Sequence, residues 1–310
     1  MDNQKEHFLG VDVGGTHLKI GLVSREGEII DFFKEDTQPL SKSPTGFNVG
    51  FVEVVGKYLS KFKQVQKVGI GLPGLISKDR TTTLEIPAIR SLDGFHLKGA
   101  LLERYPGKSF FLENDASAAA LGEFRFGKSK ASPNFLFITM GTGIGSACVI
   151  DGEIFKGSRG NAMEMGHMLS RGNVTLEKLI GRDGILHILD QMVNAYPEKA
   201  EELLNQELGT HLMVDSAKSG NQVALLAFQE VGDILGEAIV STMRILDVNE
   251  VYFGGGISAG LEFMMPSIDK TIRQYITPYY HKDLKLKKAT LGNNAGTLGA
   301  AALCFMGSGL

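Results

Sequence analysis

The sequence predicts an α/β fold of two similar lobes, each built on a β-meander. Residues 11–23 and 138–150 align without a gap, and each copy reads strand, glycine-rich turn, strand, acidic-glycine turn and strand. The 39 glycines gather in clusters between apolar strands, where the backbone can approach a ligand closely. Segments with helical apolar spacing alternate with these strands. Two β-hairpins can look alike by chance, but an internal repeat of this length indicates two lobes facing a cleft.

Apolar runs of strand length and helical periodicity predict the elements in order along the chain. We expect strands at 8–13, 20–24, 29–34, 67–74, 109–115 and 250–258, with the second meander at 138–150 and the turn and strand that follow it. We expect helices at 46–62, 98–105, 116–124, 175–192 and 222–247, helix plus loop at 193–221, and a loop and C-terminal helix at 291–307. The first lobe is expected to span 1–115 together with the helix at 295–310, and the second lobe 116–294.

Composition excludes several classes of function. A net charge of −3 gives no overall field that would attract nucleic acid or an anionic membrane, so neither is an expected partner. The two cysteines, Cys148 and Cys304, are too few for a disulfide framework or a four-thiolate zinc site, and they fit a reducing compartment. The N-terminal residues resemble neither a signal peptide nor a transmembrane segment, so a cytoplasmic location is expected.

The first glycine turn, between two strands, suits the phosphates of a nucleotide. Gly14 and Gly15 allow backbone N–H groups to face an anion, and the hydroxyl of Thr16 can donate another hydrogen bond. Asp12 could hold Mg²⁺ directly or through water, because Mg²⁺ prefers one or two carboxylates together with waters and phosphates. Taken alone, the same residues could form a bare hairpin turn.

The second glycine turn occupies the matching place in the second meander. Gly141, Thr142 and Gly143 would bind the phosphates from the opposite lobe, with the Thr142 hydroxyl as a donor. The pair of turns is a stronger indication of nucleotide binding than either turn alone.

Glu113, Asn114 and Asp115 end a predicted strand, and a predicted helix begins at Ala116. Phosphoryl transfer depends mainly on positioning and charge stabilisation, with a base that accepts the proton of the attacking hydroxyl. Asp115 fits that role, and Asn114 could orient a sugar. The alternative is that one of the two residues simply caps the following helix.

The motifs together resemble the ROK family (repressors, open reading frames and sugar kinases) of the actin and hexokinase-like superfamily. The resembling segments, in the family's order over residues 8 to 303, are VDVGGTHLKIG, GIGLPG, ENDASAAALGE, GTGIG, EMGH, VYFGGGIS and NNAGTLGAA. The resemblance implies a two-lobed actin-like (ribonuclease H-like) ATPase fold. It also implies ATP-dependent phosphorylation of a hexose or N-acetylhexosamine hydroxyl, expected at O6, with ATP and Mg²⁺ as cofactors and a homodimer as the assembly.

The resemblance also implies a role for each residue at a matching position. Asp115 matches the catalytic base that deprotonates the sugar hydroxyl. The sugar-binding positions are Asn114, Glu164, His167 and Glu177, to which we add Gly74. The ATP-binding positions are Gly14, Gly15, Thr16, Thr142, Gly254, Gly255 and Gly256, to which we add Asp12, Lys19, Gly141 and Gly143. Without the other motifs, Glu164 and His167 could be a mere surface pair.

The sequence departs from the family pattern in two places. Many members carry a cysteine-rich zinc loop between the positions of His167 and Glu177, but the stretch here, MLSRGNVTL, contains no cysteine. We therefore expect no structural zinc. The loop at 85–97 also lacks the asparagine that touches the sugar in relatives; Arg90, Ser91 or Asp93 could substitute, or the sugar does not need that contact.

Two other classes of function compete with a kinase. Some ROK proteins are transcriptional repressors with an N-terminal helix-turn-helix domain, for which a first strand near Phe8 leaves no room, and the chain has no basic stripe. A catalytically weak sugar-binding sensor is the second alternative, which the missing zinc motif favours. The presence of Asp12, Asn114 and Asp115 argues against it.

Overall fold

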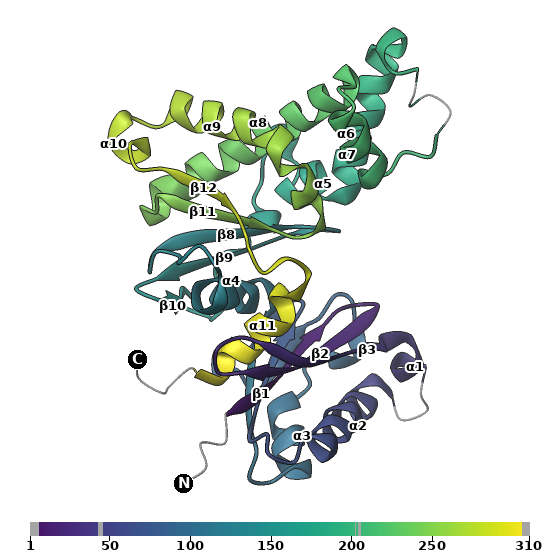
Figure 1. Cartoon of the computed structure of the whole chain (residues 1–310), viewed down its shortest axis with the longest axis vertical. Coiled ribbons are helices and arrows are strands. Elements are labelled where there is room, and N and C mark those ends of the chain that lie inside the picture. The colour runs from purple at the N-terminus through teal and green to yellow at the C-terminus, as the bar shows by residue number, and fades with distance from the viewer. Residues whose placement is uncertain (1–5, 43–45, 202, 204–205, 306–310) are drawn as a thin grey trace. The chain divides into compact units, whose positions relative to one another are not determined.

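The structure is a computed structural model that describes residues 6–42, 46–201, 203 and 206–305 (Figure 1). The chain divides into two compact units. Unit 1 comprises Met1–Pro133, Ala147–Met163 and Thr290–Leu310, and unit 2 comprises Asn134–Ser146 and Glu164–Ala289. This division into compact units does not test where one lobe ends and the other begins. The lobe boundary expected at residue 115 therefore stays a prediction.

The first five-stranded sheet has the order β3-β2-β1-β4-β7. The strands are β1 His7–Val13, β2 His17–Ser24, β3 Ile29–Asp36, β4 Lys67–Leu72 and β7 Ser109–Asn114. The first three form an antiparallel meander, whereas β4 runs parallel to both β1 and β7. β1 is buried over most of its length, and β3 alternates between half-buried and exposed residues as expected for a strand at a sheet edge.

Helices pack against this sheet and bury its apolar side chains. α2 (Gly46–Lys61) and α3 (Leu97–Arg104) bury Phe47, Phe51 and Leu101 against the strands on one face. α11 (Ala295–Ala302) contacts β1 and β4, and α4 (Asp115–Phe126) packs beside it. Both helices are rich in alanine and glycine, which lets their backbones approach closely. The end of β7 is therefore attached to a packed core.

The second five-stranded sheet repeats the arrangement, with the order β10-β9-β8-β11-β12. Its strands are β8 Phe135–Met140, β9 Ile144–Ile150, β10 Glu153–Ile154, β11 Glu250–Gly254 and β12 Lys285–Lys288. β11 runs parallel to β8 and to β12, as β4 does to its own neighbours. The duplicated meander and the α/β class predicted from the sequence are confirmed.

Some of the remaining α-helices of the described residues fall within predicted segments, but those at 37–41, 261–275 and 278–281 were not predicted. The remaining helices are α1 Thr37–Ser41, α5 Leu176–Ile180, α6 Arg182–Ala195, α7 Thr210–Lys218, α8 Gln222–Leu246, α9 Leu261–Tyr275 and α10 Pro278–His281. A small hairpin of β5 (Leu75–Ile76) and β6 (Thr83–Glu85) forms a further sheet. Of the predicted C-terminal helix, residues 306–310 lie outside the described residues. Within those described, no helix has the length and apolar character needed to cross a membrane.

The single helix predicted at 175–192 is wrong in one respect, because α5 and α6 are separated at Gly181. Gly181 adopts an extended conformation (φ −70°, ψ 175°). The amide of Arg182 then donates to the carbonyls of Gly141 (3.2 Å) and Thr142 (3.3 Å). The break therefore anchors the second glycine turn.

Glu123 of α4 holds the C-terminal segment of unit 1 in place. Its carboxylate is 1% exposed and accepts hydrogen bonds from the Thr290 amide (3.0 Å to each oxygen), the Thr290 hydroxyl (2.7 Å) and the Leu291 amide (3.2 Å). All donors of this set lie just before α11.

Replacing Glu123 with alanine is expected to lower the free energy of unfolding by about 2 kcal/mol, because partly buried donors lose their acceptor. Urea denaturation monitored by circular dichroism measures the change. Glu153→Ala, at an exposed position of β10, is the matched control and should lie within about 0.5 kcal/mol of the wild type. Equal effects of the two substitutions would contradict the anchoring role of Glu123.

Candidate active site

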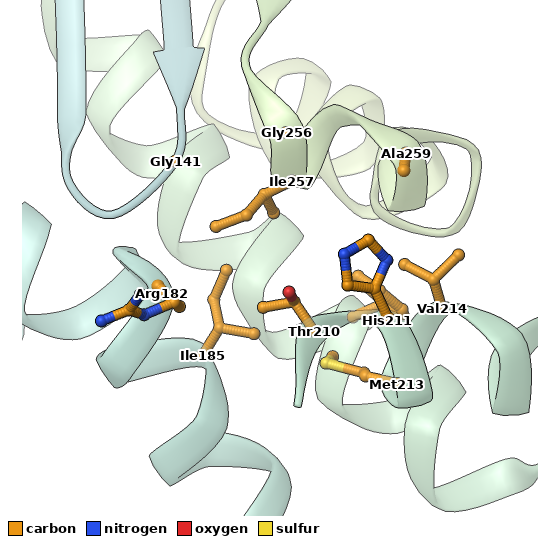
Figure 2. A pocket seen from close by; sticks show the side chains of 11 residues that line it. Gly141, Arg182, Ile185, Thr210, His211, Met213, Val214, Gly256, Ile257 and Ala259 are labelled. Atoms are coloured by element: carbon orange, nitrogen blue, oxygen red, sulfur yellow. The ribbon is translucent and has the colours of Figure 1, made fainter. Parts of the chain in front are cut away.

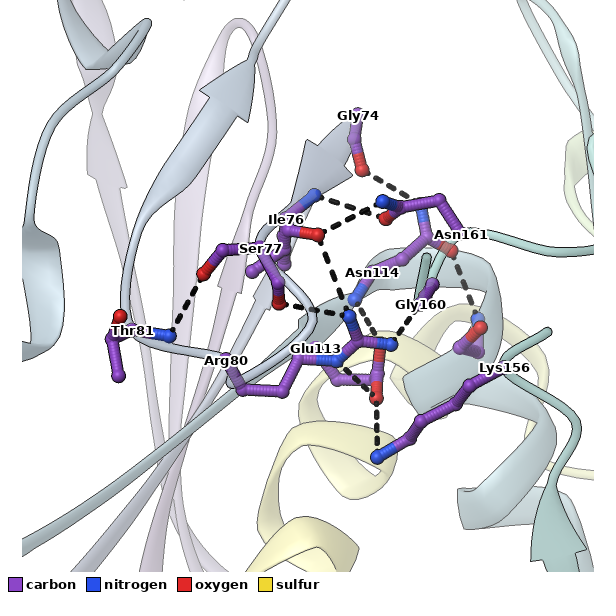
Figure 3. A network of polar contacts seen from close by, with 11 residues as sticks. Gly74, Ile76, Ser77, Arg80, Thr81, Glu113, Asn114, Lys156, Gly160 and Asn161 are labelled. Carbon is purple, nitrogen blue, oxygen red and sulfur yellow. Dashed lines mark hydrogen bonds and ion pairs between the residues drawn. The ribbon is translucent and has the colours of Figure 1, made fainter. Parts of the chain in front are cut away.

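Asn114 and Asp115 lie at the junction of β7 and α4 in unit 1. The Asn114 side-chain oxygen accepts from the Ser117 amide (3.1 Å), so Asn114 is the N-cap of α4, as the alternative interpretation expected. Its side-chain nitrogen also donates to the carbonyl of Gly74 (3.3 Å; Figure 3). The Asp115 carboxylate is partly exposed, and its Oδ1 accepts from the Ala116 amide (2.8 Å). The structure therefore brings Asn114, Asp115 and Gly74 together.

The first glycine turn is tied to its surroundings through backbone groups. The Gly14 amide donates to the His17 carbonyl (2.9 Å) and closes the turn between β1 and β2. The Thr37 hydroxyl donates to the Gly15 carbonyl (2.6 Å), and the Thr37 amide donates to the Thr16 carbonyl (3.0 Å). Gly15 and Thr16 remain exposed. The turn is thus held in shape while its tip is open to a ligand.

Asp12 is a largely buried carboxylate next to this turn. It faces Lys19 across the β1–β2 ladder, with 3.5 Å between Oδ2 and Nζ. A Cβ at Gly296 of α11 would overlap the Asp12 carboxylate, so only glycine leaves it this space. Burial raises the pKa of Asp12, an effect that the charge of Lys19 partly offsets.

The residues around Asp12 fit a magnesium ion that is bound mainly through a nucleotide. The described residues contain no group of three or more His, Cys, Asp or Glu side chains able to hold a metal. Mg²⁺ does not require such a group, since it takes one or two carboxylates with waters and substrate phosphates. Asp12 is one such carboxylate, next to the first glycine turn.

The second glycine turn, in unit 2, is supported by a residue that the family resemblance assigned to the sugar. The Gly141 amide donates to the Gly143 carbonyl (2.9 Å). Oε2 of Glu177 accepts from the Ile144 amide (2.9 Å), and a Cβ at Gly143 would overlap this oxygen. Thr142, at the tip, is exposed. One carboxylate oxygen of Glu177 is therefore committed to the turn.

Glu164 is the N-cap of a short 3-10 turn, Met165–His167, in unit 2, and His167 is the last residue of that turn. Their side chains are 42% and 71% exposed, with 4.0 Å between Glu164 Oε2 and His167 Nε2. Burial raises the pKa of Glu164; the charge of His167 opposes this rise and that of Glu177 adds to it. The predicted sugar residues of unit 2 therefore act on one another electrostatically.

Two of the predicted ATP residues, Gly141 and Gly256, line a pocket of about 160 Å³ in unit 2 (Figure 2). Gly255, just before Gly256, has φ +83°, and a Cβ there would overlap the Met140 backbone. The chain can therefore turn tightly from β11 toward the pocket only with glycine at this position. The other lining residues are Arg182, Ile185, Thr210, His211, Met213, Val214, Phe228, Ile257 and Ala259.

The sequence did not point to Thr210 or His211. They begin α7 within the polar stretch 193–221, which carries no motif, and the nearest signal is the glycine that precedes them. Gly254, in contrast, ends β11 and does not line the pocket. The pocket is mainly apolar, with a few polar groups, as is usual for sites that bind flat organic rings.

In the loop 85–97, two candidate substitutes for the missing asparagine are engaged with the loop itself. Asp93 accepts from the Ile86 amide (2.6 Å) and from Arg90 (3.2 Å), and these hydrogen bonds, the first foremost, lower the pKa of Asp93. A contact of Arg90, Ser91 or Asp93 with a sugar stays a prediction.

The duplicated meander and the polar residues at its glycine turns define an α/β protein of the actin-like class. The chain belongs to the ROK family, whose family model matches residues 8–306. It is 30% identical to the glucokinase of Thermotoga maritima, over 96% of this chain and 97% of that protein.

Solved structures agree with this membership. The ROK family glucokinase of Streptomyces griseus in complex with glucose and AMPPNP is 28% identical, with a TM-score of 0.78 over 97% of this chain and 100% of that one. A crystal structure from Cytophaga hutchinsonii has a TM-score of 0.91 and 36% identity, over 96% of this chain and 99% of that one. The expected family and fold class are thereby confirmed.

Proposed function

We propose that this chain is an ATP-dependent sugar kinase that transfers the γ-phosphoryl group of ATP to a hydroxyl of a hexose or N-acetylhexosamine, at O6. The observation that carries the proposal is the partly exposed carboxylate of Asp115, held at the junction of β7 and α4 beside Asn114. Relatives matched over nearly their full length are glucokinases, which supports the same class of reaction.

The adenosine of ATP would occupy the pocket that Gly141 and Gly256 line. Apolar side chains such as Ile185 and Ile257 would pack against the base, and Thr210 and His211 offer polar groups. The amides of the two glycine turns would face the phosphates, with the hydroxyls of Thr16 and Thr142 as further donors. The bound AMPPNP of the Streptomyces griseus relative supports a nucleotide site in this family.

Asp12 would hold Mg²⁺ directly or through water. The ion, when bound, offsets negative charge on the phosphates. The ammonium group of Lys19, whose Nζ lies 3.5 Å from Asp12 Oδ2, would add positive charge next to the same phosphates. Both residues project from the β1–β2 hairpin, so one rigid element would present metal ligand, cation and glycine turn together.

Asp115 would act on the sugar hydroxyl that attacks the γ-phosphorus. Its carboxylate accepts the hydroxyl proton as the new O–P bond forms, and ADP leaves as the bond to the β-phosphate oxygen breaks. Asn114, Glu164 and His167 would bind the other sugar hydroxyls. Glu177 has one oxygen bonded to the Ile144 amide, so its second oxygen is the one open to a sugar.

A coupled ADP-release assay over glucose, mannose, fructose, allose and N-acetylated hexosamines tests the proposal. We expect at least one of these sugars to raise ADP release well above the rate with ATP and Mg²⁺ alone. Calorimetric titration of the same sugars is the companion measurement. Sugar binding with no stimulated ADP release would refute the kinase and favour the sugar-binding sensor.

A further inference from the structure

A buried carboxylate directly precedes the proposed active residues. Glu113, the penultimate residue of β7, is 1% exposed. Its Oε1 accepts from the Asn114 amide (3.0 Å) and lies 2.9 Å from Arg80 Nη2. Its Oε2 accepts from Arg80 Nε (3.0 Å) and lies 3.5 Å from Lys156 Nζ (Figure 3). The Glu113 carboxylate at the end of β7 is therefore held by the backbone amide of Asn114 and by a bidentate contact with Arg80.

Arg80 connects this carboxylate to two other segments of unit 1. Its side chain is 11% exposed, and Nη2 also donates to the Gly160 carbonyl (2.6 Å). Nη1 donates to the Ser77 carbonyl (3.1 Å). A guanidinium has five donors in a rigid fork, so one side chain can fix three segments at defined angles, which a lysine cannot do.

Asn161 closes the arrangement from the other side. Its side-chain oxygen accepts from the Ile76 amide (3.0 Å) and its side-chain nitrogen donates to the Ile76 carbonyl (2.9 Å), as a neighbouring strand would. Asn114 reaches the same hairpin through the Gly74 carbonyl (3.3 Å). Segments 74–80, 113–114 and 160–161 are thus joined by side chains. We name Arg80, Glu113 and Asn161 the strand-end clamp.

We propose that Arg80 is a positioning residue for phosphoryl transfer. It holds Glu113, and Glu113 in turn fixes the positions of Asn114 and Asp115. This inference rests on the proposed kinase function. A buried ion pair contributes little net stability relative to apolar side chains of similar size, so stability alone does not account for it. Catalytic groups, in contrast, require placement within about 0.5 Å, and an error of about 1 Å can lower the rate about 100-fold.

The test compares Arg80→Lys and Arg80→Met with the wild type, using the sugar of highest turnover in the panel. We expect kcat to fall at least about tenfold in Arg80→Met and less in Arg80→Lys, which keeps the charge but loses the fork. The KM for ATP should stay within about threefold, because the proposed adenosine pocket lies in the other unit. Hydrogen exchange of the amides at 114–117 should accelerate in both variants, and more in Arg80→Met than in Arg80→Lys.

Leu59→Ala is the control for a merely structural role. Leu59 lies on α2 and is 6% exposed in the core of unit 1, so its truncation destabilises the same unit away from the clamp. Its kcat per folded molecule should remain that of the wild type. A kcat within twofold of the wild type in folded Arg80→Met would overturn the inference while leaving the kinase intact. A wild type that turns over no sugar would instead refute the proposed function, and unchanged hydrogen exchange in both variants would then refute the clamp as well.

Discussion

Asp115→Asn is expected to lower kcat by about 1,000-fold, because a positioned general base contributes roughly 100- to 10,000-fold. The amide has nearly the shape of the carboxylate and retains an oxygen for the Ala116 amide. We therefore expect the start of α4 and the sugar affinity to be largely preserved. Steady-state ADP release gives kcat, and calorimetric titration gives the dissociation constant of the sugar.

Asp190→Asn provides the matched control for this substitution. Asp190 is exposed on α6, where it accepts from Asn194 (3.3 Å). The control should leave kcat at the wild-type value. Near-normal turnover of Asp115→Asn would remove Asp115 from the role of base, whereas loss of sugar binding would indicate that it acts mainly as a ligand.

Asp12→Asn is expected to abolish most of the activity and yet to stabilise the protein. Loss of the proposed magnesium carboxylate should reduce kcat about 100- to 1,000-fold, as for other groups that stabilise transition-state charge. The folded protein should gain stability at neutral pH, because burial raises the pKa of Asp12 and so disfavours its ionised form in the folded state.

The sign of this effect gives a pH dependence. A folded-state pKa above the ordinary value of 3.8 means that stability is lost as pH rises from about that value through the folded-state pKa. The wild type therefore carries the full penalty at neutral pH, and asparagine carries none. Thermal melts between pH 4 and 8 should show Asp12→Asn above the wild type at pH 7, with the difference narrowing on acidification. A lower melting temperature at pH 7 would mean that the Lys19 pair outweighs burial.

The repeated meander was predictable because it depends on local patterns. Apolar runs separated by glycine turns mark β1, β2, β8 and β9, and helical spacing marks α2 and α8. The pattern misses β12, whose sequence KLKK reads as a charged loop. Lys285 and Lys287 can lie in a strand because they pair with the buried Glu250 of β11 at 3.3 and 2.8 Å. That partner is more than 30 residues away, so local reasoning does not find it.

Two further differences have similar causes. α9 was not predicted, and it contains Pro266, a residue that usually ends a helix. The prediction of one helix across 175–192 ignored Gly181, where the Arg182 amide leaves the helical pattern for the second glycine turn. Both differences involve tertiary contacts: α9 packs against α8 despite Pro266, and the Arg182 amide bonds to the second glycine turn at the break that Gly181 allows.

In the candidate site, motifs identified single residues, whereas the contacts between segments required the structure. Asn114 and Asp115 were candidates from the strand–helix junction, and their roles came from the resemblance to the ROK family. The partnership of Arg80 with Glu113, 33 residues away, and that of Glu177 with the Ile144 amide follow from the tertiary fold. No spacing rule connects such pairs. The role of Glu177 is the clearest example, since a residue assigned to the sugar is also a support of the phosphate turn.

A crystal structure of this chain with AMPPNP, Mg²⁺ and the sugar of highest turnover tests the central claim most directly. The account predicts that an Asp115 carboxylate oxygen lies about 2.6–3.2 Å from the sugar hydroxyl that faces the γ-phosphate. An Asp115 side chain that points away from the sugar, bonded only to amides of its own helix, would contradict the account.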